Sequence, residues 1–86
     1  MSIFAFVSVS DKGEISIFKQ LNYAQFHRAN FVVQLCDDKC IVAKDRYGMN
    51  GREITAMGAL TLAIDHMLVA SEKMTRDEFF IKWGFE

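Results

Sequence analysis

The sequence contains no long apolar run and no surplus of charge of either sign. A membrane-spanning helix needs about 20 predominantly apolar residues, and no segment of the chain approaches this length. The 10 Lys and Arg against 11 Asp and Glu give a formal net charge of -1. This balance supplies neither the basic field of a nucleic-acid binder nor the acidic surplus of a DNA mimic. Overall charge therefore selects no class of partner, and we expect no contact with a membrane.

Cysteine is scarce, and the N-terminal segment lacks the features of a secretory signal. The chain has two cysteines, and no basic region precedes its first apolar run. A signal peptide requires such a basic region, so nothing in the sequence indicates export. The expected compartment is the reducing cytoplasm, where both thiols stay free.

The sequence also lacks the common catalytic motifs. It contains no Gly-x-Ser-x-Gly, no His-Glu-x-x-His and no phosphate loop ending in Lys-Ser or Lys-Thr. His66 follows Asp65, but adjacent residues on a helix point about 100° apart and do not form a preorganised acid-base pair. We therefore expect no enzyme, and we predict no catalytic residues, no metal and no cofactor.

The chain does have enough apolar residues for one packed domain, 1–86. Its 86 residues are 51% hydrophobic and 13% aromatic, which is well above the content of a disordered segment. β-Branched and aromatic residues predict two hairpins, which are formed by strands at 2–10 and 15–20 and at 31–36 and 39–44. In the first hairpin, Gly13 supplies the positive φ of a tight turn.

Three helix starts are predicted from one recurring pattern, the capping box. In this pattern a short polar residue precedes the helix, and a Glu or Gln three residues later bonds back to its backbone N–H. The pattern occurs at Asn22 and Gln25, at Asn50 and Glu53, and at Thr75 and Glu78. It predicts helices at 23–29, 51–73 and 76–83. Gly84 suits the left-handed position that ends the last helix, where Phe85 would pack on Phe80.

The predicted order is β-β-α-β-β-α-α, which is an α+β fold. It comprises a four-stranded antiparallel sheet with a long helix and a short C-terminal helix packed against one face. Bulky residues recur at helical spacing on the long helix and are expected to lie on the sheet; they are Ile54, Met57, Leu60, Ile64 and Leu68. The stripe that contains Leu62, Asp65 and Val69 must then be covered by the last helix, by a second copy or by another protein.

These features favour a non-enzymatic small binding protein that acts by protein-protein contact. The candidate partner-binding residues are Leu62, Asp65, Val69, Trp83 and Phe85, because large aromatic residues are enriched at interfaces. The partner is another protein, or a second copy that forms a homodimer through the long helix. Phage and mobile-element inhibitors of host nucleases or defence complexes, including anti-CRISPR proteins, have this general size and character, which is an analogy and not a motif resemblance.

A small nucleic-acid-binding regulator is the first alternative. The segment 39–52 carries basic residues with an interleaved aromatic residue, which are Lys39, Lys44, Arg46, Tyr47 and Arg52. Such residues beside a helix N-terminus bind phosphates or a single strand. The competing interpretation is a solvated hairpin edge, which lysine and arginine protect from edge pairing.

A thiol or metal protein centred on Cys36 and Cys40 is the second alternative. If the hairpin loop has three residues, Cys36 lies opposite Cys40; if the loop is only Asp37-Asp38, Cys40 joins Leu35 in the core. The longer loop is favoured because Asp-Asp supplies no glycine for a two-residue turn. Zinc usually takes four ligands, so two cysteines at this spacing do not predict a metal site.

Overall fold

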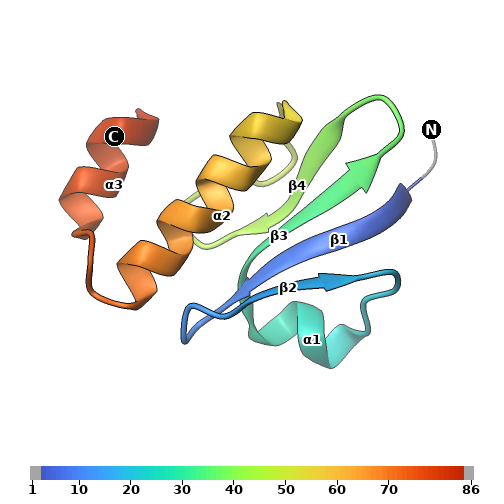
Figure 1. The fold of residues 1–86 in the computed structure, drawn as a ribbon, viewed down its shortest axis with the longest axis horizontal. Coiled ribbons are helices and arrows are strands. Elements are labelled where there is room, and N and C mark those ends of the chain that lie inside the picture. The colour runs from blue at the N-terminus through green and yellow to red at the C-terminus, as the bar shows by residue number, and fades with distance from the viewer. Residues whose placement is uncertain (1–2, 85–86) are drawn as a thin grey trace.

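A five-stranded antiparallel sheet with helices on both of its faces forms the body of the computed structural model, which describes residues 3–84 (Figure 1). The sheet order is β2-β1-β3-β4-β5. The strands are β1 (Ile3–Ser10), β2 (Ile15–Phe18), β3 (Ala29–Cys36), β4 (Cys40–Asp45) and β5 (Glu53–Ile54). The helices are α1 (Tyr23–Arg28), α2 (Ala56–Ala70) and α3 (Arg76–Trp83). The predicted α+β class and the order of the predicted elements are confirmed, and β5 is an additional strand.

The predicted turn between β1 and β2 forms as a three-residue loop with Gly13 at φ 82°. The backbone N–H of Ser10 donates to the carbonyl of Glu14 (2.9 Å), and the Gly13 N–H donates to the Ser10 carbonyl (3.0 Å). A Cβ on Gly13 would lie 3.2 Å from Ala70 Cβ at the end of α2. Glycine is therefore required here both for the turn and for the close approach to the helix.

Two of the three predicted capping boxes form. Asn22 accepts from the Gln25 N–H and Thr75 accepts from the Glu78 N–H, and the Gln25 and Glu78 side chains bond back in both cases. At the end of α3, Gly84 adopts φ 73° and its N–H donates to the Phe80 carbonyl. The predicted contact of residue 85 with Phe80 lies outside the described residues.

The middle capping box was wrong, and the segment it was expected to place in a helix contains β5. The Asn50 side chain instead bonds the backbone of Asp45, accepting from its N–H (2.7 Å) and donating to its carbonyl (3.2 Å). Glu53 and Ile54 pair with β4. α2 therefore begins after Thr55, whose hydroxyl accepts from the Gly58 N–H (3.0 Å). It ends at Ala70 and not at residue 73, because Glu72 takes a positive φ of 62°.

The face of α2 that packs on the sheet is not the predicted bulky stripe. Ala59, Leu62 and Ala63 are at most 4% exposed and belong to the core, whereas Met57 and Leu60 are 72% and 57% exposed. Two small residues on the buried side allow the helix to lie close to the valine-rich sheet. α3 packs beside α2 (Figure 1), where Phe79 is fully buried in the same core.

α1 lies against the opposite face of the sheet. Val32 and Lys44 lie opposite each other on this face, since the neighbouring Val33 points into the α2 side. Lys44 Nζ donates to the carbonyls of Phe26 (2.9 Å) and His27 (2.8 Å) in the last turn of α1. A cation at this end of a helix satisfies free carbonyls and complements the helix dipole.

The β3–β4 hairpin has the two-residue loop Asp37-Asp38, so the favoured three-residue loop was wrong. Leu35 lies opposite Cys40, and the Cys36 N–H donates to the Lys39 carbonyl (2.9 Å). This register places Leu35 and Cys40 on the core side, and a shift by one residue would turn them outward. Burial of apolar side chains therefore outweighs the glycine preference of the turn. Cys36 and Cys40 are both buried, free thiols.

Candidate partner-binding surface

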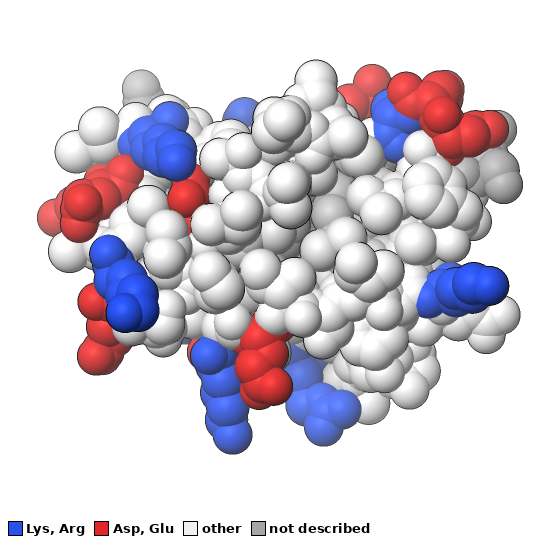
Figure 2. Space-filling view, in the orientation of Figure 1, with Lys and Arg blue, Asp and Glu red and all other residues white. Residues whose placement is uncertain are grey.

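α2 presents to solvent an apolar stripe with no charged side chain. Met57, Leu60 and Ile64 are 72%, 57% and 38% exposed and recur at helical spacing, and we call these three residues the α2 surface. Asp65 is the one Asp, Glu, Lys or Arg of the helix and is 3% exposed. Figure 2 shows the result: the centre of the face in view is almost uncharged, and Lys, Arg, Asp and Glu gather near its outline. Large apolar side chains grouped on a helix in this way are typical of an interaction site.

A small apolar hollow borders the α2 surface. It has a volume of about 200 Å³ and opens between the first turns of α2 and the adjoining strands β1 and β3. Its lining residues are all apolar: Val7, Val33, Leu35, Ala56, Ala59 and Leu60. The hollow can therefore accept an apolar side chain from a partner next to Leu60.

The apolar surface continues from the hollow onto β2. Ile17 lies opposite Val7 in the β1–β2 register, so its side chain is on the same face of the sheet as the hollow. Ile17 is 72% exposed, and Ile15, two residues earlier on the same face, is 42% exposed. Helix and edge strand together thus expose bulky aliphatic residues on one side of the molecule.

The sequence-predicted binding residues on α2 do not lie on its exposed side: Leu62 belongs to the core, and Asp65 bonds to residues of α3. Leu62 is 0% and Asp65 is 3% exposed. The Trp83 indole N–H donates to Asp65 Oδ2 (2.9 Å), and Lys82 Nζ lies 2.9 Å from the same oxygen. Val69 is partly buried against the core, as is Trp83, and residue 85 lies outside the described part of the chain. Of the covers considered for this stripe, α3 is the one observed at Asp65, whereas Leu62 is enclosed in the core, so neither residue is available to a partner.

Two of the four predicted basic residues bond to other parts of the domain. Lys39 Nζ forms an ion pair with Glu53 (2.9 Å), and Lys44 caps α1 as described above. The Tyr47 ring stacks on His66, with ring centroids 5.3 Å apart, and packs against the core. Arg46 and Arg52 are exposed. Two of the four cations are thus engaged in contacts within the domain, and the aromatic residue packs inward.

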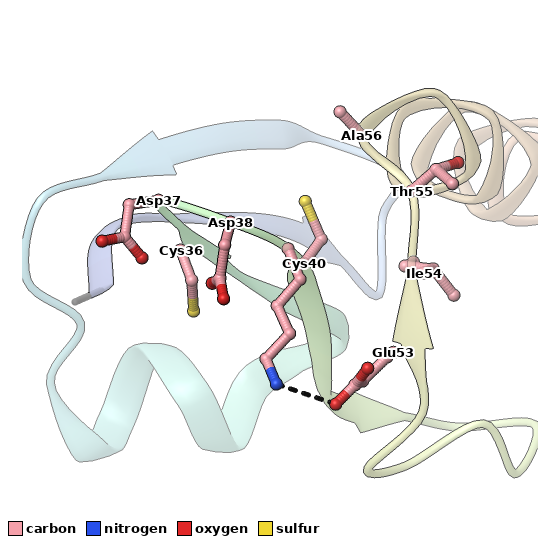
Figure 3. Close-up of a pocket in the computed structure, with 9 residues that line it drawn as sticks. Cys36, Asp37, Asp38, Cys40, Glu53, Ile54, Thr55 and Ala56 are labelled. Atoms are coloured by element: carbon pink, nitrogen blue, oxygen red, sulfur yellow. Dashed lines mark hydrogen bonds and ion pairs between the residues drawn. The ribbon is translucent and has the colours of Figure 1, made fainter. Parts of the chain in front are cut away.

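The two cysteines belong to different faces of the sheet. Figure 3 shows the sulfur of Cys40 pointing toward the start of α2 and that of Cys36 pointing the opposite way, beside a shallow hollow of about 650 Å³. Burial raises the pKa of the Cys40 thiol, and the charge of Cys36 adds to this. A thiol with a raised pKa is a poor nucleophile and a poor metal ligand. Within residues 3–84, no group of three or more His, Cys, Asp or Glu side chains is placed to hold a metal.

A buried acid-base pair links the end of β4 to α2. His66 Nε2 lies 2.9 Å from Asp45 Oδ1, and both side chains are at most 1% exposed; the ring N–H is not well aligned for a linear hydrogen bond. Burial alone raises the pKa of Asp45. The close approach of His66 and the backbone N–H groups of Tyr47 and Met49 stabilise the carboxylate more than burial disfavours it, so the net pKa of Asp45 is lowered. Because solvent does not reach the pair, we assign it to holding the fold.

Sequence reasoning missed both this pair and the exposed stripe. It tested His66 against its chain neighbour Asp65, whereas the actual partner, Asp45, comes from another element. No spacing rule connects the two residues. The exposed stripe was recognised as a stripe, but it was assigned to the sheet.

Comparisons with protein-family models, curated proteins and solved structures give no match for this chain. In residues 3–84, no helix combines the length and apolar character needed to cross a membrane. Function must therefore be argued from the surface itself.

Proposed function

We propose that this protein is a non-enzymatic binding module that contacts another protein through the α2 surface and the adjoining hollow. The observation that carries the proposal is the exposure of Met57 (72%) and Leu60 (57%) on a helix that shows no charged side chain to solvent. A small domain gains stability from each large apolar residue that it buries. Leaving these residues outside the core is most simply explained by a partner that buries them.

The chemistry of the surface defines the partner that fits it. Burying a large apolar side chain completely contributes about 1.5–3 kcal/mol to the binding free energy. The α2 surface gains this energy only if the partner covers it with an apolar patch of its own. The hollow beside Leu60 suits one protruding aliphatic or aromatic side chain. Inhibitor, adaptor and subunit roles all fit this contact, including that of a phage or mobile-element inhibitor of a host nuclease or defence complex.

The partner is identified by a photo-crosslinking amino acid placed at position 60 and, in a separate variant, at position 81. Ile81 is 82% exposed on α3 and lies outside the α2 surface, so it provides a matched control. A protein that crosslinks from position 60 and not from position 81 is then purified. Its affinity for the wild type, Leu60→Glu and Ile81→Glu is measured by calorimetry.

We expect Leu60→Glu to weaken binding by at least about 30-fold, which is the effect of an interface hot spot, and Ile81→Glu to change it less than threefold. Equal effects of the two variants, with unchanged folding, would contradict the proposal. Salt-dependent binding of a nucleic acid that Arg46→Ala and Arg52→Ala abolish would instead support the nucleic-acid interpretation.

A further inference from the structure

A polar hollow lies on the face of the sheet opposite α2. It opens between α1 and the β1–β2 hairpin and has a volume of about 400 Å³, which is within the range of small-molecule sites. Figure 1 shows α1 beside β2 at this side of the molecule. In contrast to the apolar hollow beside Leu60, its lining includes three serines: Ser8, Ser10 and Ser16.

The strand register explains why polar side chains meet in this hollow. Ser8 on β1 lies opposite Ser16 on β2 and opposite Val32 on β3. Residues directly opposite each other in a sheet share a face, so both serines are on the α1 face with Val32. α1 adds Gln25 and Arg28, which are three residues apart and therefore on one side of the helix. Three elements thus bring their polar side chains to one place.

Ser8 is the residue that points to a ligand. It is 7% exposed and lines the hollow, and no hydrogen bond joins its hydroxyl to another of the residues 3–84. A buried hydroxyl without a partner costs stability, and a valine would suit this position of a strand better. Stability given up for an available polar group is typical of a binding site.

Two neighbouring side chains also keep donors available to a ligand. The Ser10 hydroxyl accepts from the backbone N–H groups of Lys12 (3.2 Å) and Glu14 (3.0 Å), which leaves its own O–H to donate. Gln25 Oε1 accepts from the Asn22 N–H (3.1 Å), which leaves the NH₂ group of Gln25 to donate. The hollow therefore offers several hydrogen-bond donors beside the Ser8 hydroxyl.

The charges around the hollow are balanced and exposed. Lys12 and Arg28 are opposed by Asp11 and Glu14, and all four residues are exposed. The buried end at Ser8 offers a hydroxyl, which donates and accepts hydrogen bonds but carries no counter-charge. A charged group would lose its hydration there without compensation. The part of a ligand that reaches Ser8 is therefore neutral.

We propose that this hollow binds a neutral polyhydroxylated molecule of the size of a monosaccharide, with one of its hydroxyl groups bonded to Ser8. Each sugar hydroxyl both donates and accepts, which matches the serine, amide and ionic side chains of the lining. Phe18 also lines the hollow and offers an apolar surface to the C–H groups of a sugar ring. The inference does not depend on the proposed function, because this hollow and Leu60 lie on opposite faces of the sheet.

Nuclear magnetic resonance titration of the isotope-labelled full chain tests the inference. The probes are D-glucose, D-galactose, D-mannose and N-acetyl-D-glucosamine, and glycine and inorganic phosphate represent zwitterionic and anionic ligands. We expect at least one sugar to bind with a millimolar or lower dissociation constant and to shift the backbone amide signals of β1, β2 and α1. The inference is overturned if no sugar shifts these signals, or if only glycine or phosphate does.

Variants of Ser8 separate a binding role from a structural one. Ser8→Ala removes the hydroxyl, and Ser8→Val also fills the hollow; we expect each to weaken sugar binding at least about tenfold. The free energy of unfolding in urea should stay the same or rise. Ser71→Ala, an exposed change outside the hollow, and Leu60→Glu should bind the sugar as the wild type does.

The opposite outcome for Ser8 is equally defined. Unchanged sugar affinity in Ser8→Ala, with or without a loss of stability, would show that the hydroxyl does not hold the ligand and would overturn the inference. If Ser8→Val does not fold, Ser8→Ala decides alone.

Discussion

Replacing Asp45 with Asn removes the charge at the point where β4, the following turn and α2 meet. The Asp45 carboxylate accepts from the backbone N–H groups of Tyr47 (3.1 Å) and Met49 (3.0 Å) and lies 2.9 Å from His66 Nε2. Asn has nearly the same shape but only one carbonyl oxygen. Its NH₂ group would therefore face one of these donors.

The expected loss of stability is about 2–4 kcal/mol. A hydrogen bond to a charged group contributes about 1.5–3 kcal/mol, and leaving a buried donor without a partner costs about 1–3 kcal/mol. Asn retains one acceptor, so the expected loss lies below the sum of these two effects. A domain of 86 residues has a free energy of unfolding of about 4–13 kcal/mol. Asp45→Asn should thus remove a large fraction of the total.

Urea denaturation followed by circular dichroism at pH 7 measures this loss, with Asp38→Asn in the exposed hairpin loop as the matched control. The control should change the free energy of unfolding by less than about 0.5 kcal/mol. If Asp45→Asn has as small an effect as Asp38→Asn, with an unchanged m-value, the structural role assigned to the carboxylate is refuted.

The pH dependence has a defined sign. The folded pKa of Asp45 is lowered from 3.8, so the contribution of its charge is fully present above the unfolded pKa. It is lost as the pH falls below about 4 and through the lower folded value. The stability difference between wild type and Asp45→Asn should therefore narrow on acidification. A difference that widens below pH 4 would contradict the assigned direction of the shift.

Three further changes test local features of the fold. Gly13→Ala forces a side chain into φ 82° against α2 and should lower the free energy of unfolding by about 1–3 kcal/mol, measured by urea titration. Trp83→Phe removes the bond to Asp65 and should cost about 1–2 kcal/mol in the same assay; no loss would mean that the indole N–H is dispensable. Diamide should form no disulfide between Cys36 and Cys40 in the folded monomer, and a loss of 2 Da by mass spectrometry would refute the observed register.

The parts of the fold that could be predicted from sequence are those that local chemistry specifies. Asn22 and Thr75 begin helices and Gly13 forms a hairpin turn, because each needs only neighbouring residues to do so. The same pattern at Asn50 failed because its side chain has a better partner in the backbone of Asp45. A capping residue beside the end of a strand can bond either to the first turn of a helix or to the backbone of the strand. Tertiary contacts decide which of these two bonds forms.

The candidate site was harder to predict for a related reason. Periodicity identified the residues that share a face of α2, but it does not say which face lies on the sheet. In the structure His66 lies inside beside Asp45, together with Ala59, Leu62 and Ala63, and Leu60 lies outside. In the β3–β4 hairpin, tertiary packing again outweighs a local preference. Burial of Leu35 and Cys40 sets the register, although Asp37-Asp38 is not a preferred two-residue turn.

The most direct test of the proposed function is the affinity of the crosslinked partner for Leu60→Glu relative to Ile81→Glu. Both variants place a charge at an exposed apolar position, with Leu60 at 57% and Ile81 at 82% exposure. A loss of at least about 30-fold for Leu60→Glu alone is the predicted result. Wild-type affinity in Leu60→Glu, with the fold intact, would show that the α2 surface is not the binding site.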